Sequence, residues 1–71
     1  MSGNLPLSRG ATGTVVISVQ SDLRTLGYDL GPAGVDGDFG TSTGHAILAF
    51  RAKHSLPAVE QIDRALLDRL R

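Results

Sequence analysis

A run of turn-forming residues divides this chain into two helical parts. The stretch from Gly27 to Gly40 contains five glycines, one proline and three aspartates. No helix interior tolerates this density, because glycine and proline destabilise helices and aspartate favours turns. We therefore expect a long structured loop here, with helices before and after it.

The segment before the loop has the periodicity of an amphipathic helix. Its apolar residues recur at intervals of three and four: Val16, Val19, Leu23 and Leu26. At about 100° per residue this spacing places them on one stripe, and Gln20 lies mostly off it with the other polar residues. Thr14 is suited to cap the start of this helix.

The Leu26-Gly27-Tyr28 sequence is typical of a helix end. Gly27 can adopt the left-handed conformation that closes a helix, and Tyr28 is then placed to fold its ring back on Leu23. We therefore expect the first helix to end at Leu26.

The chain after the loop indicates two further helices. Thr41 or Ser42 can cap the first of these, and one of its faces gathers Thr43, Ala46, Ile47 and Phe50. Pro57 forces the residue before it toward an extended conformation. Asp63 can then cap a last helix that runs to about Leu70, with Ile62 as a hydrophobic staple. This last helix is expected to bury Leu66, Leu67 and Leu70.

These elements predict an all-α fold, a compact three-helix bundle with long structured loops. Residues 1–13 contain three glycines, two serines and a proline, and we expect them to form a flexible lead-in. Residues 14–71 then form the only domain that a chain of 71 residues can hold. Without cysteine, helix packing must supply the stability, about 3 to 5 kcal/mol for so small a core.

Charge and composition exclude several functions. The formal net charge is zero, so the electrostatic attraction that drives binding to nucleic acid is largely missing. The first ten residues contain no apolar run, so they predict neither a signal peptide nor a membrane span.

No constellation of residues predicts catalysis or metal binding. His45 and His54 are nine residues apart, which places them on opposite faces of a helix. Asp36 and Asp38 resemble the start of a calcium loop, but the later acidic ligands are absent. The serines lack the glycine-flanked setting of a nucleophile. We therefore expect no enzyme activity, no metal and no cofactor.

The order of these segments resembles the peptidoglycan-binding domain of the PG-binding-1 type. The matching residues are Gly13, Val16, Val19-Gln20, Leu23, Leu26-Gly27-Tyr28, Asp36-Gly37, Phe39-Gly40, Thr43, Ala46-Ile47 and Phe50. The resemblance covers about residues 13–70 and implies a three-helix domain that anchors cell-wall hydrolases to peptidoglycan.

The sequence departs from the family pattern after Phe50. Arg51 replaces a glutamine, and Ser55 replaces the glycine before Leu56. Val59-Glu60 stands where the pattern has a second Asp-Gly turn. These changes keep the apolar spacing that the last helix needs for the fold. They affect mainly the contacts that the second turn would make.

Four residues are candidates for contact with peptidoglycan. Tyr28 combines an apolar ring with a polar tip, so it is suited to be the partner of the helix end, a binding residue or both, because its hydroxyl can still reach outward. Asp36 and Asp38 are suited to stabilise their own turn, and Asp38, at a variable position, is the better placed for a ligand. Arg51 can meet a carboxylate of a stem peptide or satisfy the end of its own helix.

The resemblance implies a noncatalytic, monomeric module that targets a covalently linked hydrolase, such as a phage endolysin or N-acetylmuramidase, to murein. With no visible signal peptide, we expect synthesis in the cytoplasm and action at the bacterial cell wall or periplasm. The alternative is a protein-interaction or propeptide-like module of the same fold that does not bind murein.

Overall fold

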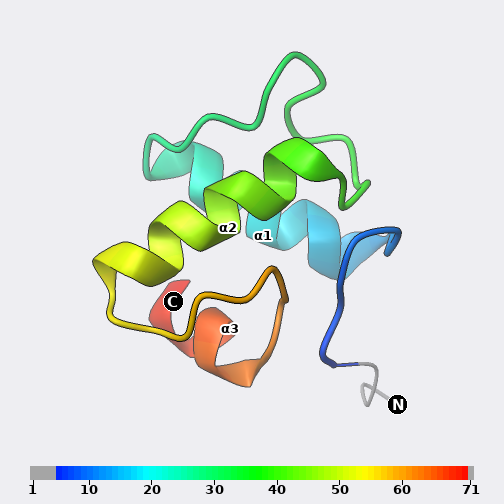
Figure 1. Cartoon of the computed structure of the whole chain (residues 1–71). Coiled ribbons are helices and arrows are strands. Elements are labelled where there is room, and N and C mark those ends of the chain that lie inside the picture. The colour runs from blue at the N-terminus through cyan, green and yellow to red at the C-terminus, as the bar shows by residue number, and fades with distance from the viewer. Residues whose placement is uncertain (1–4, 71) are drawn as a thin grey trace.

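The computed structural model describes residues 5–70, which form three helices (Figure 1). Helix α1 spans Thr14–Thr25, α2 spans Thr41–Lys53 and α3 spans Arg64–Leu70. Helix α1 packs against both others. In Figure 1 the loop over residues 28–40 arches over one side of the α1 and α2 pair, and α3 lies on the opposite side. The prediction of an all-α three-helix fold is confirmed.

The core combines apolar faces that the helical periodicity predicted with Leu30, Phe39 and Ile62 from the segments between the helices. Its buried members are Val16, Val19, Leu23, Leu30, Phe39, Ala46, Ile47, Phe50, Ile62, Leu66 and Leu67. Leu70 is only partly buried at the edge of this cluster. The prediction for Leu26 is wrong, because α1 ends at Thr25 and the Leu26 side chain remains 55% exposed in the turn that follows.

Two of the three predicted N-caps are also wrong. Gly13 and Gly40 occupy the cap positions of α1 and α2, and neither helix has a side-chain cap. Their carbonyl groups already accept the first helical hydrogen bonds, so α1 begins one residue earlier than expected and α2 one or two residues earlier. Asp63 does cap α3 as predicted, since its Oδ1 accepts the Leu66 N–H at 3.0 Å.

Helix α1 ends in a Schellman motif. Gly27 has a φ of 94°, the left-handed conformation that glycine adopts most readily. The Gly27 N–H donates to the carbonyl of Arg24, and the Tyr28 N–H donates to that of Leu23 at 2.9 Å. The helix stop predicted at Gly27 is therefore confirmed, although the last helical residue is Thr25 and Leu26 is the C-cap.

Helix α2 ends in the same way, but without glycine. Ser55 occupies the left-handed position with a φ of 57°. The Leu56 N–H donates to the carbonyl of Arg51 at 2.9 Å. A side chain in this conformation is strained, because its Cβ approaches the following carbonyl oxygen. The departure from the family pattern at Ser55 therefore keeps the motif at a cost in stability.

The segment before α1 is bonded to the rest of the domain. Leu7 and Ile62 exchange backbone hydrogen bonds of 2.9 and 2.8 Å, and Ala11 accepts the Phe39 N–H at 2.9 Å. Arg9 forms two hydrogen bonds with the Glu60 carboxylate, at 2.6 and 2.9 Å. Within residues 5–13, which were expected to belong to a flexible lead-in, several backbone groups thus pair with two distant loops. The same expectation for residues 1–4 lies outside the described residues.

Two carboxylates tie the third helix and its preceding loop to the domain. Hydrogen bonds from Arg9 hold the pKa of Glu60 below its ordinary value despite the effect of burial. Burial raises the pKa of Asp63, but the Leu66 N–H and the Arg51 guanidinium, 3.0 Å away, outweigh that effect and lower it overall. Both groups therefore bind protons less readily in the folded state.

Replacement of Ser55 by glycine should stabilise the domain. Ser55→Gly removes the strain at the positive φ and should raise the free energy of unfolding by about 0.5 to 1 kcal/mol. For a domain of this size each kcal/mol raises the Tm by about 4 to 8 °C. Urea titration measures this change. The matched control is Ser18→Gly in the exposed face of α1, which should instead destabilise by about 0.5 kcal/mol. A loss of stability in both variants would contradict the account of the α2 end.

Acid should destabilise the domain through Glu60 and Asp63. Because their pKa values are lower in the folded state, their contribution to stability is complete above the unfolded pKa values, about 4, and is lost as the pH falls below them. Melting curves between pH 7 and pH 2.5 measure this effect. We expect the double variant Glu60→Gln, Asp63→Asn to lose less stability on acidification than the parent chain. An equal loss in both would show that other groups govern the acid response.

Candidate functional site

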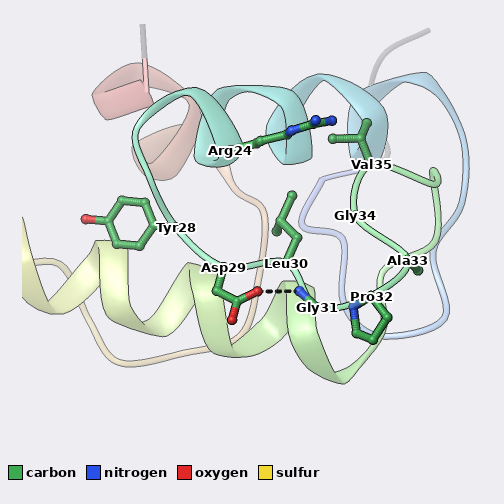
Figure 2. A pocket seen from close by; sticks show the side chains of 9 residues that line it. All are labelled: Arg24, Tyr28, Asp29, Leu30, Gly31, Pro32, Ala33, Gly34 and Val35. Atoms are coloured by element: carbon green, nitrogen blue, oxygen red, sulfur yellow. Dashed lines mark hydrogen bonds between the residues drawn. The ribbon is translucent and has the colours of Figure 1, made fainter.

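An open groove lies between the end of α1 and the loop that follows it (Figure 2). Its volume is about 480 Å³. The lining residues are Arg24, Tyr28, Asp29, Leu30, Gly31, Pro32, Ala33, Gly34 and Val35. Leu30 forms the floor, since it points inward in Figure 2 and belongs to the core.

Local hydrogen bonds shape the wall of this groove. Asp29 Oδ1 accepts the Gly31 N–H at 2.8 Å, and the Gly31 carbonyl accepts the Gly34 N–H at 3.2 Å. Gly31 and Gly34 have φ values of 78° and 62°, which confirms that these glycines serve turns. The loop is therefore a defined wall with an open side.

Tyr28 lies at one end of the groove. Its ring packs edge-on against Phe50, with ring centroids 5.9 Å apart and an angle of 69° between the ring planes. The His54 ring lies on Phe50 in turn, with a centroid distance of 4.2 Å. The Tyr28 N–H donates to the Leu23 carbonyl, and the Tyr28 ring, which was expected to fold back on Leu23, is half-buried against the core. In Figure 2 the Tyr28 hydroxyl points outward, away from the other lining residues. One residue thus ends the helix and leaves a polar group at the surface.

Asp36 and Asp38 lie in the next turn and do not line the groove. Asp36 Oδ1 accepts the Asp38 N–H at 3.0 Å and the amide of Gln20 at 3.1 Å. The hydrogen bonds from Asp38 and Gln20 lower the pKa of Asp36. The Asp38 backbone shares in this turn, while its side chain is exposed.

The side chain that organises this turn is Gln20, which sequence reasoning placed off the apolar stripe. Gln20 is fully buried, and its Nε2 lies 2.9 Å from both the Asp38 carbonyl and Thr43 Oγ1. Its Oε1 accepts the Gly37 N–H at 2.8 Å. The missed signal is its spacing, since Gln20 follows Val16 by four residues and therefore shares its face.

Arg51 lies in the interior, away from the groove. Its side chain is fully buried, and it donates to the carbonyls of Pro57 at 3.3 Å and Gln61 at 2.7 Å. It also lies 3.0 Å from Asp63. The sequence offered a ligand contact or the end of its own helix as the role of Arg51, but its side-chain contacts are with the loop between α2 and α3.

The described residues contain no group of three potential metal ligands among histidine, cysteine, aspartate and glutamate. No helix over residues 5–70 is long and apolar enough to cross a membrane. The groups that the groove offers to a ligand are one aromatic residue, two charged side chains and the backbone of the loop.

Comparison with known proteins places this fold among cell-wall proteins. A family model for a peptidoglycan-binding domain matches residues 12–70. The N-terminal domain of SleB is 35% identical, with a TM-score of 0.85 over 96% of this chain and 90% of that one. No curated protein sequence matches the chain.

Two longer proteins contain a similar unit. A peptidoglycan-binding protein from Clostridioides difficile, solved in complex with glutamine hydroxamate, is 33% identical, with a TM-score of 0.87 over 99% of this chain and 42% of that one. An L,D-transpeptidase from Xylanimonas cellulosilytica is 30% identical, with a TM-score of 0.85 over 99% of this chain and 33% of that one. The chain thus spans less than half of either protein.

The family model covers most of the chain, and the matched range includes both the Gln20-bound turn and the groove. The resemblance found in the sequence is therefore confirmed. The chain belongs to the PG-binding-1 family of peptidoglycan-binding domains.

Proposed function

We propose that this domain binds peptidoglycan without cleaving it and holds a linked hydrolase, of the endolysin or N-acetylmuramidase class, on the cell wall. The observation that carries the proposal is the open groove with Tyr28 in its lining and the Tyr28 hydroxyl at the surface beside it. Grooves with one amphipathic aromatic residue and a few polar groups suit ligands that combine apolar and polar faces.

Similar units in longer proteins support the idea of a linked enzyme. One of them is a fused zinc-dependent amidase, peptidase and peptidoglycan-binding protein from Clostridium acetobutylicum, which is 29% identical with a TM-score of 0.83. This chain covers 28% of that protein. By analogy we propose that a catalytic domain accompanies this unit and that it acts as a monomer at the wall.

A weak site is sufficient for this role. A tethered module converts the second binding event on a polymer into an intramolecular one, so even a shallow groove raises the local concentration of the enzyme on its substrate. The groove need not enclose its ligand as an active site does.

The four residues predicted from the sequence take different parts in this proposal. Tyr28 is the principal contact, because it alone among them lines the groove. Asp38 is a second contact on the adjacent turn, where its side chain is exposed. Asp36 and Arg51 support the two loops and are assigned no contact with the polymer.

The discriminating variant is Tyr28→Phe, measured by cosedimentation with purified sacculi. The parent chain should pellet with the sacculi and release no soluble fragments. Tyr28→Phe keeps the ring packed on Phe50 and loses only the hydroxyl, so we expect an unchanged Tm and retention reduced by about threefold to tenfold. Asp38→Ala should also reduce retention at constant Tm.

The control is Asp68→Ala on the exposed face of α3, which should pellet like the parent chain. Equal retention of all variants would place the contact surface elsewhere. A parent chain that stays in the supernatant would instead favour the protein-interaction module, and release of soluble fragments would refute the noncatalytic role.

A further inference from the structure

The groove carries one charge of each sign. Arg24 extends from α1 along one rim and Asp29 lies on the opposite rim, as Figure 2 shows. Both residues are exposed. In the described part of the chain the ion pairs are Arg9 with Glu60 and Arg51 with Asp63, so neither Arg24 nor Asp29 is neutralised by a partner.

The remaining features of Asp29 and Arg24 also leave them available to a ligand. Asp29 uses Oδ1 for the Gly31 N–H, and a carboxylate can accept further hydrogen bonds at its second oxygen. Arg24 has five N–H donors in a planar arrangement that matches a carboxylate. Leu30 lies between the two rims as an apolar floor.

The two components of peptidoglycan differ in the charged groups that they offer to such a groove. Its glycan strand offers hydroxyl and acetamide groups, whereas its stem peptide offers carboxylates and, where a diamino acid is present, an amine. A neutral glycan gains little from two unneutralised charges of opposite sign. A peptide with both charges and short aliphatic segments is complementary to both rims and to the floor.

The aromatic content of the groove points in the same direction. Binding to the apolar face of a sugar requires an accessible ring surface, and Tyr28 is the single aromatic residue in the lining. Its ring is half-buried and packs against Phe50, so the hydroxyl is its most available group.

We propose that this groove recognises the stem peptide rather than the glycan strand, with Arg24 on a carboxylate and Asp29 on an amine. This inference rests on the proposed binding to peptidoglycan. It assigns to Arg24 and Asp29 the specificity of the site, and it gives the Tyr28 hydroxyl a neutral hydrogen bond at one end.

The test is an NMR titration of the 15N-labelled chain with three soluble probes. These are a stem tetrapeptide with free carboxylates, the same peptide with amidated carboxylates, and glycan strands freed of peptide whose exposed lactyl carboxylates have been converted to amides. We expect the free tetrapeptide to shift the amide signals of Gly31 and Gly34, and the glycan strands to leave them in place. The amidated peptide should bind about fivefold to tenfold more weakly, because it cannot form the charge-assisted pair with Arg24.

Three variants assign the charges. Arg24→Gln should lose the preference for the free over the amidated peptide. The four affinities, of the parent chain and this variant for each peptide, form a double-mutant cycle between Arg24 and the carboxylate. Asp29→Asn keeps an acceptor for the Gly31 N–H, so the loop stays folded while affinity for the amine falls. Arg69→Gln, an exposed arginine of α3 outside the groove, is the control and should bind as the parent chain does.

Shifts at Gly31 and Gly34 with glycan strands but not with peptide would overturn this inference and leave the proposed function standing. An unchanged peptide preference in Arg24→Gln would also overturn it. A parent chain that fails to pellet with intact sacculi would refute the proposed function itself.

Discussion

One buried amide holds the first half of this domain together. The Gln20 side chain reaches from α1 to the carboxylate of Asp36, the carbonyl of Asp38, the hydroxyl of Thr43 and the N–H of Gly37. Each buried polar group left without a partner costs about 1 to 3 kcal/mol, so these contacts compare with the whole stability of a small core. The turn fixed in this way also brings Phe39 into the core and leads into α2.

The second half repeats this arrangement with a different side chain. Helix α2 also ends in a Schellman motif, and buried Arg51 binds the loop that follows through the Pro57 and Gln61 carbonyls and the Asp63 carboxylate. In both halves a polar residue in the core face of a helix fixes the next loop. A guanidinium can only donate, and this loop presents carbonyl and carboxylate acceptors to it.

These clamps explain why the groove lies where it does. The loop over residues 28–35 is fixed at its start by the end of α1 and beyond its end by the turn that Gln20 holds. Its middle is shaped by its own short hydrogen bonds and faces solvent over Leu30. A rigid frame with an open middle suits the recognition of an extended polymer, which needs access from the side.

Much of the fold was predictable because helical periodicity and turn residues are local signals. The core faces of all three helices, the stop at Gly27 and the cap at Asp63 follow from spacing and residue type. The burial of Gln20 and Arg51 was not predictable in this way, since it depends on hydrogen-bond partners from turns and loops that only the fold brings near. The same reason hid the pairing of residues 5–13 with two distant loops.

The candidate site was predictable only in part. Tyr28 stands out as an aromatic residue with a polar tip beside a glycine-rich loop. Arg24 and Asp29 have the pattern of solvated surface residues, and only the folded loop brings them to opposite rims of one groove (Figure 2).

The role of Gln20 is tested most directly by the free energy of unfolding of Gln20→Glu, measured against the parent chain from pH 7 to pH 4. At pH 7 the introduced carboxylate can accept the Gly37 N–H but cannot donate to Asp36, Asp38 or Thr43, so we expect a loss of about 3 kcal/mol or more. Burial beside Asp36 raises the folded pKa of the introduced group above its unfolded value, so the deficit should shrink as the pH falls through that folded pKa. A variant that is unfolded at pH 7 and folds on acidification would also support a central role for the Gln20 amide. A difference below about 0.5 kcal/mol at pH 7 that does not change with pH would contradict a central role for this amide.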